Sequence, residues 1–538
     1  MKIKSLFVPV YKNVTVDLKL HADQITLLVG QNGMGKSNLL EVLLLIFDEL
    51  YQLKEKGKRA ERLPLHYAIE YECRGRNFSI TKMTDKHIFS EYTVNADGGV
   101  ESWEIDMQEI ELPNQIIGYY SGENKRIRNL VEKHIQSENR SKRIRYSRGD
   151  EWGFRPRKLF FAENRHYMLV LTTLLLYKNH GLYGENIKKV LYDIVNVDSW
   201  DRIHLKFRNP KIAIASNLRK EGLTLEYYRD MLLQGENLEE VPIFWGVLGI
   251  VDKLLRLLLY YFIDNSLNYG IMPAKQGVKE YFEIESIPSD DKFQKLLYDK
   301  FPTPMEFLNA LEECFVLNII EDFDIFLHKE GEREPYPYLH LSEGEQQYLT
   351  VMGLIALAHS SQDETLFLLD EPDTHINPQW QRSFIKHILD LTNTEADKKS
   401  KAFFISTHSP LLVQANSRGD KEVDLLLFKR DEHGKVQIDT DEDEVFRNWR
   451  IDQVLMSKYF DLPSSRPESL DKFMERRKAL IIGEDKTEVR ESLGSDVDER
   501  GYLPTGETMA EVEAMVFIHQ MAEELRKKGG TDEVHRPE

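Results

Sequence analysis

The chain has 538 residues, of which 41% are hydrophobic, and carries a formal net charge of -19 at pH 7. This length allows two or more domains with sizeable cores, and the acidic balance argues against a surface coated throughout for nucleic acid. The two cysteines, Cys73 and Cys314, are too few for a disulfide framework or a zinc site. Such sparse cysteine usage is typical of a reducing cytosol.

Neither a signal peptide nor a membrane span is expected. The N-terminus alternates like strands and lacks the apolar core and the small-residue cleavage site of a signal peptide. The most apolar long window, residues 246–265, carries Asp252, Lys253 and Arg256, which would be costly at a bilayer centre. We therefore expect a cytoplasmic protein with a buried helix at this window.

The first third of the chain, residues 1–150, is predicted to be a lobe of strands around one helix. Alternating and continuous apolar segments predict the strands, and the segment "SNLLEVLLLIFDELYQL" predicts the helix. The strand segments are "KIKSLFVPV", "VTVDLKL", "QITLLVG", "HYAIEYEC", "NFSITKM" and "NQIIGYY". A mixed sheet with one early helix follows from this order.

Three further regions are expected. Residues 151–335 have a mostly helical pattern, interrupted by the strand-like "HLKFR", and predict a helical insertion. Strands and helices alternate over residues 336–448, which predicts a parallel core sheet with helices on its faces. Residues 449–538 predict a C-terminal helical extension that ends in an amphipathic helix. The predicted fold class is therefore α/β.

The segment "GQNGMGKS" at residues 30–37 matches the phosphate-loop pattern G-x-x-x-x-G-K-[ST] between an apolar strand and a helix. Glycines let the backbone amides approach phosphate oxygens, and the N-terminus of the following helix favours their negative charge. Lys36 is expected to reach the β- and γ-phosphates, and Ser37 to ligate Mg²⁺. The predicted nucleotide-binding residues are Gly30, Gln31, Asn32, Gly33, Met34, Gly35, Lys36, Ser37 and Asn38.

Two more strands end in chemically useful residues. The apolar strand "TLFLLDE" ends in Asp370 and Glu371, which would lie at the carboxyl edge of the sheet, where open α/β folds bind ligands. Asp370 fits Mg²⁺ coordination, and Glu371 fits activation of the attacking water. His408 follows the strand in "FFISTHSP" and could contact a γ-phosphate from the same edge.

The segment "LSEGEQQ" at residues 341–347 predicts a helix start. Ser342 would be the N-cap, and Glu345, three residues later, would complete a capping box.

The order of these motifs, a phosphate loop, then "LSEGEQQ", then "LLDEP", then "STH", resembles that of ABC-type ATPases, and within them the RecF-like and SMC-like branch. The resemblance implies an ABC-type ATPase head that uses ATP and Mg²⁺. It also implies that Leu341, Ser342 and Gly344 contact the nucleotide of a second copy in a head-to-tail dimer. His408 matches the switch histidine of this class, which gives it a catalytic role beside Lys36 and Glu371.

Three positions fit that pattern less closely. Asn377 stands where many relatives have an aspartate after the catalytic glutamate. Gln115 is a candidate for the Q-loop glutamine. His375 has two open interpretations, a structural one and a position near the nucleotide.

Four segments together resemble PtuA, the ATPase family of Septu-type antiphage systems, including its retron-associated members: "IIGYYSGENKRI", "LHLSEGEQQYL", "LLDEPDTHINP" and "WRIDQVLMSKYFDL". The resemblance implies a regulatory ATPase that controls a separate HNH nuclease, PtuB, and for retron-associated members a reverse transcriptase with its RNA and DNA product. The sequence contains no sustained heptad pattern, so a long coiled coil of the SMC type is not expected. A catalytic Toprim domain, which OLD-family nucleases carry after the ATPase, is not expected. In the nearest local match, "KALIIGEDKTEV" followed by "SDVDERG", no Glu precedes Gly483, and few residues remain for such a domain.

Several alternatives stay open at this point. The chain could instead be a RecF-like DNA repair ATPase, or a nucleotide-switched scaffold with little turnover. The final helix, residues 509–528, could pack on its own ATPase domain or dock a partner. Residues 121–158 contain 12 Lys and Arg against five acids. This basic segment, from Lys125 to Lys158, is either a solvated charged helix or a nucleic-acid contact.

Overall fold

The structure is a computed structural model of the whole chain. It describes residues 1–22, 24–57, 63–83, 86–95, 97–121, 129–130, 132, 136, 157–162, 166–194, 196–208, 249–264, 269–272, 281–329, 331, 334–359, 363–415, 423–430, 436–440, 450–457, 460, 462, 467–482, 486–505 and 507–529.

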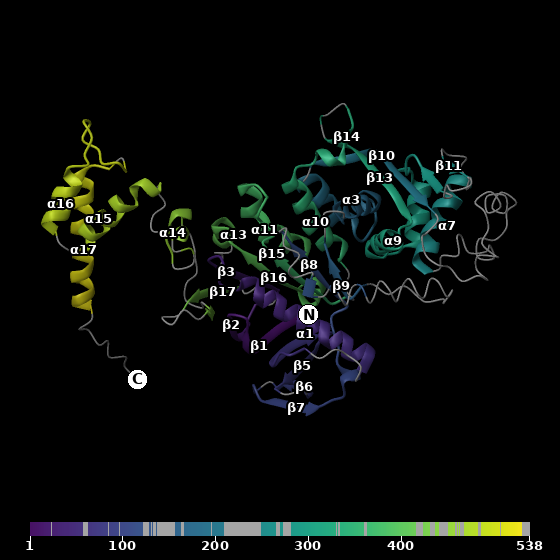
Figure 1. Cartoon of the computed structure of the whole chain (residues 1–538), viewed down its shortest axis with the longest axis horizontal. Helices are drawn as coiled ribbons and strands as arrows, with labels where there is room; N and C mark the ends of the chain where they lie inside the picture. The colour runs from purple at the N-terminus through teal and green to yellow at the C-terminus, as the bar shows by residue number, and fades with distance from the viewer. Residues whose placement is uncertain are drawn as a thin grey trace. The chain divides into compact units, whose positions relative to one another are not determined.

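Contacts divide the chain into two compact units, which we call unit 1, Met1–Arg447, and unit 2, Asn448–Glu538. All strands labelled in Figure 1 belong to unit 1, and the labelled elements of unit 2 are helices, α14 to α17. The finer sequence boundaries near residues 150 and 335 stay predictions.

A large mixed sheet is the framework of unit 1. Among the described residues it has thirteen strands in the order β7-β6-β5-β4-β1-β2-β18-β17-β3-β16-β15-β8-β9. The strands are β1 (Lys2–Tyr11), β2 (Val14–Lys19), β3 (Ile25–Gly30), β4 (Tyr67–Cys73), β5 (Arg76–Lys82), β6 (His87–Val94), β7 (Val100–Glu104), β8 (Gln115–Tyr120), β9 (Leu159–Phe161), β15 (Thr365–Asp370), β16 (Lys401–Thr407), β17 (Val423–Arg430) and β18 (Val436–Thr440).

The two halves of this sheet differ in strand direction. From β17 through β3, β16, β15 and β8 to β9, neighbouring strands are parallel. From β7 through β6, β5, β4 and β1 to β2 they are antiparallel. The central strands "ITLLVG", "TLFLLD" and "KAFFIST" are buried along their whole length, as expected for parallel strands covered on both faces. The mixed α/β fold predicted from the sequence is confirmed.

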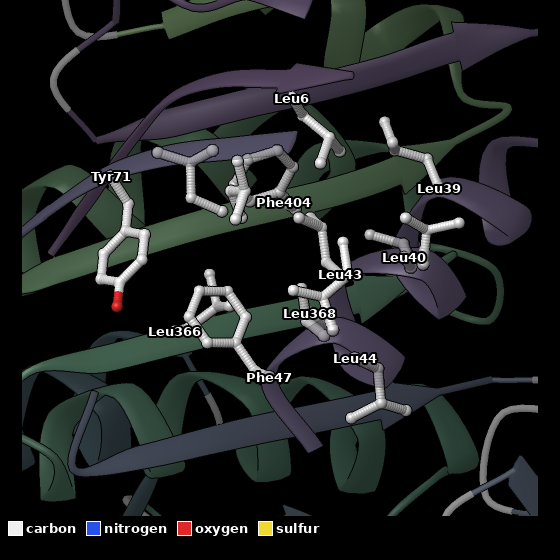
Figure 2. Packing of buried hydrophobic residues seen from close by; sticks show 14 of the residues in the cluster. Leu6, Leu39, Leu40, Leu43, Leu44, Phe47, Tyr71, Leu366, Leu368 and Phe404 are labelled. Carbon is white, nitrogen blue, oxygen red and sulfur yellow. The ribbon is translucent and has the colours of Figure 1, made fainter. Parts of the chain in front are cut away.

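Helix α1 (Lys36–Lys56) packs against this sheet through one continuous apolar stripe. Leu39, Leu40, Leu43, Leu44 and Phe47 recur at the i, i+3, i+4 spacing that places them on one helix face, and each is 0% exposed. Figure 2 shows these side chains beside sheet residues from both halves, among them Leu6, Tyr71, Leu366, Leu368 and Phe404. The helix that begins at the phosphate loop is therefore held by the core of the whole sheet.

The insertion contains several helices, and beside them it has strands of which the sequence pattern had suggested only "HLKFR". It contains a second sheet, of five strands in the described residues, in the order β11-β12-β10-β13-β14. Its neighbouring strands are antiparallel. Two of the pairs join segments far apart in the chain, because β10 pairs with both β12 and β13. The strands are β10 (Val197–Arg208), β11 (Tyr269–Met272), β12 (Tyr281–Ile284), β13 (Ile320–Lys329) and β14 (Tyr336–Pro337).

Helices of the insertion and of the core sheet pack together within unit 1. α3 contacts both α9 and α10, and this packing is close because a Cβ on Gly353 of α10 would lie 2.5 Å from Val170 of α3. The insertion helices are α3 (His166–Tyr177), α4 (Gly184–Lys188), α7 (Gly249–Asp264), α8 (Asp291–Lys300) and α9 (Pro304–Val316). The later helices are α10 (Glu343–Leu357), α11 (Pro378–Leu391), α12 (Glu395–Ser400) and α13 (Pro410–Ala415).

Unit 2 has a small core of its own. It contains α14 (Ile451–Leu455), α15 (Asp471–Ile482), α16 (Lys486–Gly494) and α17 (Met509–Gly529). Val512 of α17 is fully buried against Phe473 and Leu480 of α15, whereas Phe517 and Ile518 are more than 60% exposed. The final helix, α17, therefore packs against α15 within unit 2. No helix in the described parts of either unit is long and apolar enough to cross a membrane.

Candidate functional site

The carboxyl ends of four neighbouring parallel strands meet at one edge of the core sheet. Thr407 at the end of β16 lies opposite Val29 of β3, and Asp370 at the end of β15 lies opposite both Ser406 and Tyr120. The phosphate loop, the acids after β15 and His408 after β16 all follow these ends. The register of the parallel strands therefore brings together motifs that are more than 300 residues apart in sequence.

The phosphate loop needs glycine at two positions for different reasons. Gly30 has a φ of 150°, and a Cβ there would lie 2.6 Å from the carbonyl oxygen of Phe428. Gly35, the N-cap of α1, has a φ of 90°, and its Cβ would lie 2.3 Å from Val14. Both φ values lie in the region that favours glycine, so the loop can make this tight turn only with glycine at these two positions.

The loop borders an open cleft of about 480 Å³. The lining residues come from the phosphate loop, from the turn between β1 and β2, and from the ends of β15 and β16; they are Lys12, Asn13, Asn32, Gly33, Gly35, Lys36, Ser37, Asn38, Glu371 and His408. Asn13 bonds to Asn38 and to the carbonyl of Gly33. Sequence reasoning missed Lys12 and Asn13, because a turn 17 or more residues before the loop carries no motif.

Lys36 extends into this cleft. Its Nζ donates to the carbonyl of Gly30 at 2.7 Å and lies 2.7 Å from Nε2 of His408. Burial lowers the pKa of Lys36 from 10.5 to about 8, although Glu371 and Asp370 favour its charged form. The ammonium is therefore held in a partly desolvated place, where an anionic ligand would stabilise its charge.

Asp370 and Ser37 form the pair of oxygen groups predicted to hold Mg²⁺. The hydroxyl of Ser37 donates to Oδ1 of Asp370 at 3.0 Å, and the hydroxyl of Ser406 donates to the same oxygen. Asp370 is 1% exposed, and this burial raises its pKa, while the two hydroxyl bonds act in the opposite direction. A carboxylate and a hydroxyl oxygen fit a hard cation such as Mg²⁺, which takes oxygen ligands and binds with substrate phosphates.

Glu371 and His408 face each other at the same edge. Oε1 of Glu371 lies 3.1 Å from Nε2 of His408, and this contact holds the pKa of Glu371 below its usual value. The same His408 nitrogen also lies within bonding range of Lys36, so one tautomer can serve only one of these two partners at a time. Glu371 has a φ of 49°, which is unusual for a residue with a side chain.

Asp373 was not predicted from the sequence. It accepts from the hydroxyl of Thr407 at 2.8 Å, and its burial raises its pKa to about 6. The hydroxyls of "STH" thus bond to two acids of the neighbouring strand end, Ser406 to Asp370 and Thr407 to Asp373. The sequence gives no signal for this pattern, because it depends on β15 and β16 being neighbours in the sheet.

The helix start at "LSEGEQQ" is confirmed. The side chain of Ser342 accepts from the backbone N–H of Glu345 at 3.3 Å, and the N–H of Ser342 donates to the Glu345 carboxylate at 2.8 Å. Ser342 is exposed, whereas Gly344 is buried. A Cβ at Gly344 would lie 2.5 Å from the carbonyl oxygen of His375, so this glycine also allows close packing within the chain.

The structure places three secondary candidates elsewhere. Gln115 is the first residue of β8 and lies opposite Thr365, the first residue of β15. It is therefore at the amino ends of these parallel strands, at the edge opposite to Asp370, and its prediction as a Q-loop residue is wrong. Ser121, just after β8, lies at the carboxyl edge instead, where its hydroxyl accepts from Thr374 at 2.9 Å. Asn377 caps α11 by accepting from the N–H of Trp380, and His375 is exposed.

Most of the basic segment from Lys125 to Lys158 lies outside the described residues, including all of its cations before Arg157. Arg157 is buried and pairs with Glu312 at 2.7 Å, so it does not belong to a charged surface.

A family model described as "AAA domain, putative AbiEii toxin, Type IV TA system" matches residues 195–414, less than half of the chain. The matched range includes Ser342, Asp370, Glu371 and His408. Together with the phosphate loop, the match supports an ABC-type P-loop ATPase. A comparison with curated proteins finds no match.

Solved structures of SMC heads are similar at a low level. The SMC head domain from Thermotoga maritima is 12% identical, with 82% of this chain and 100% of that one covered and a TM-score of 0.28. The Smc head with an extended coiled coil from Pyrococcus furiosus, bound to the C-terminal domain of ScpA, is 13% identical over 82% and 96% of the two chains, with a TM-score of 0.27. At TM-scores this low we draw no functional conclusion from the similarity.

Proposed function

We propose that the chain binds ATP with Mg²⁺ at the cleft and hydrolyses it. The observation that carries this proposal is the convergence of Lys36, Ser37, Asp370, Glu371 and His408 at one edge of the core sheet. Positioning and electrostatic stabilisation are what phosphoryl transfer requires of a protein. The sheet edge supplies the ammonium of Lys36, the hydroxyl–carboxylate pair of Ser37 and Asp370, and the carboxylate of Glu371 as a base.

Each side chain has a distinct part in this proposal. Lys36 binds the β- and γ-phosphates, and Ser37 with Asp370 holds Mg²⁺, which offsets the phosphate charge when bound. Glu371 orients and deprotonates the attacking water, and its lowered pKa keeps the carboxylate in the ionised form that a base needs. His408 moves from Lys36 and Glu371 to the γ-phosphate when the nucleotide enters.

The active form is proposed to be a head-to-tail dimer. Among the described residues, those that line the cleft do not include Ser342 or Gly344, the signature residues implied by the family resemblance. Ser342 is nevertheless exposed at the N-terminus of the 15-residue helix α10, where a phosphate would be favoured. A second copy can supply this helix start to the nucleotide of the first.

We further propose that the ATPase regulates a separate HNH-type nuclease in antiphage defence, with a reverse transcriptase and its product as additional partners if a retron is associated. The segments that resemble PtuA support this role. The matching family is described as a putative toxin of a type IV toxin–antitoxin system. This description also favours a role in a toxin–antitoxin or defence system over a role in DNA repair.

Protection against phage tests this role in cells that carry the gene with its neighbours. We expect Lys36→Ala and Glu371→Gln to abolish protection, because the first removes a phosphate ligand and the second the catalytic base. The control is Glu395→Gln, an exposed acid in the first turn of α12, which should protect fully. Full protection by both site variants would contradict the proposal, and copurification with an HNH protein would support it.

ATP affinity should depend on pH through Lys36. Burial holds this lysine at a pKa of about 8, whereas bound phosphates would favour its charged form, so binding should take up a proton above that pH. The ATP dissociation constant should therefore rise about tenfold between pH 7 and pH 9. Equilibrium titration with a fluorescent ATP analogue at saturating Mg²⁺ measures this. Lys36→Arg, which stays charged, should show no such rise, and a flat profile for the unmodified protein would contradict the prediction.

A further inference from the structure

Ser406 contacts both acids of the site from the neighbouring strand. Its hydroxyl donates to Oδ1 of Asp370, and its main-chain carbonyl accepts from the N–H of Glu371 at 3.1 Å. That N–H also lies 3.1 Å from Oγ of Ser406. Ser406 is 0% exposed and lies opposite Asp370 in the parallel register of β15 and β16, so these contacts are set by the sheet.

Two hydroxyls in the described structure donate to Asp370, and they differ in their access to the cleft. Ser37 lines the cleft, whereas Ser406 does not. A cation held by Ser37 and Asp370 would use a lone pair of the Ser37 oxygen, which leaves the Ser37 proton able to donate to Asp370. The Ser37 hydroxyl is thus expected to contact the metal itself, whereas the Ser406 hydroxyl can act on the metal only through Asp370.

We propose that Ser406 is a positioning residue that orients the Asp370 carboxylate for the divalent cation, and so sets the affinity for the metal rather than for the nucleotide. This inference rests on the ATPase function proposed above. The buried hydroxyl of Ser406 fixes the orientation of the Asp370 carboxylate from the neighbouring strand. Partners that orient metal ligands in this way typically change metal affinity 10- to 100-fold when they are removed.

The neighbouring residue offers a matched control. Thr407 is also 0% exposed and donates its hydroxyl to a buried acid, Asp373, at 2.8 Å. Neither Asp370 nor Asp373 lines the cleft itself, but Asp370 accepts from Ser37, which does. Thr407→Val and Ser406→Ala therefore each remove one buried hydroxyl from a carboxylate, but only Ser406→Ala removes it from the carboxylate expected to bind the metal.

The experiment measures binding of a fluorescent ATP analogue to the full chain as free Mg²⁺ is varied with a metal buffer. We expect Ser406→Ala to need 10- to 100-fold more free Mg²⁺ for half-maximal binding. At saturating Mg²⁺ its affinity for the analogue should stay within about twofold of the unmodified protein. Ser406→Thr, which keeps the hydroxyl, should restore the Mg²⁺ midpoint, and Thr407→Val should leave it unchanged.

The outcomes separate this inference from the function on which it rests. An unmodified protein that shows no Mg²⁺-dependent binding would contradict the ATPase proposal itself. If that protein binds normally, an unchanged midpoint in Ser406→Ala, or an equal shift in Thr407→Val, would overturn the role of Ser406. If Ser406→Ala does not fold, Ser406→Cys takes its place, since the thiol has a similar size but is a weaker donor. It should shift the midpoint in the same direction.

Discussion

Glu371→Gln should reduce ATP turnover by about 100- to 10,000-fold while ATP binding is retained. The amide has nearly the same shape as the carboxylate but cannot accept the proton of the attacking water. The backbone of residue 371, including its hydrogen bond to Ser406, does not depend on the side-chain charge, so the fold should be unaffected. Phosphate release under steady-state conditions measures the effect, and equilibrium binding of the ATP analogue measures what is retained.

The same variant should also accumulate as an ATP-bound dimer, because closure no longer ends in hydrolysis. Light scattering after gel filtration in ATP and Mg²⁺ detects this change. Glu395→Gln is the control for removal of one negative charge, since Glu395 is exposed on α12 and does not line the cleft. Turnover by Glu371→Gln at the rate of the unmodified protein would exclude Glu371 as the catalytic base.

Ser342→Arg should block ATP-dependent dimer closure and leave ATP binding by the single chain intact. Ser342 is exposed in the isolated chain, so an arginine there is tolerated until a second copy approaches. An unpaired charge buried at that contact costs about 3 kcal/mol or more, which corresponds to a dimer about 100-fold weaker. Introducing the arginine into Glu371→Gln, whose dimer should be long-lived, makes the loss easy to detect by light scattering.

The variant also removes a helix cap, and this second effect must be separated from the first. Ser342→Ala removes the same cap without adding bulk, at a cost of about 1 kcal/mol of stability. It also removes the hydroxyl proposed to contact the nucleotide of the second copy, so it should weaken closure, but less than Ser342→Arg, which adds a buried charge. Thermal unfolding should show a similar loss of stability in both variants. Unchanged closure in Ser342→Arg would mean that the segment is only a helix start.

The elements that were predicted correctly depend on short-range patterns. The phosphate loop between β3 and α1 follows from a spacing of eight residues, and the start of α10 follows from Ser342 and Glu345, three residues apart. The apolar strand that ends in Asp370 and Glu371 follows from a run of a few residues. In each case the residues that determine the local structure are neighbours in sequence.

What the sequence did not reveal concerns long-range strand pairing. The central strand of the second sheet, β10, pairs with β12 and β13, which lie about 80 to 120 residues further along the chain, and no local pattern encodes such pairing. Gln115 is a Q-loop candidate in sequence although it lies near the start of the strand segment "NQIIGYY" and Ser121 follows it. The register that pairs Gln115 with Thr365 confirms that it begins the strand.

The sequence by itself determined which residues are candidates for the chemistry, namely Lys36, Ser37, Asp370, Glu371 and His408, because their motifs are local and depend on spacing. Only the tertiary structure decided how they are held. The parallel register of β3, β16, β15 and β8 brings the strand ends together and places the Ser406 hydroxyl against Asp370. The turn between β1 and β2 adds Lys12 and Asn13 to the cleft. These relations depend on which strands become neighbours, and that is settled by burial of the whole core rather than by any single segment.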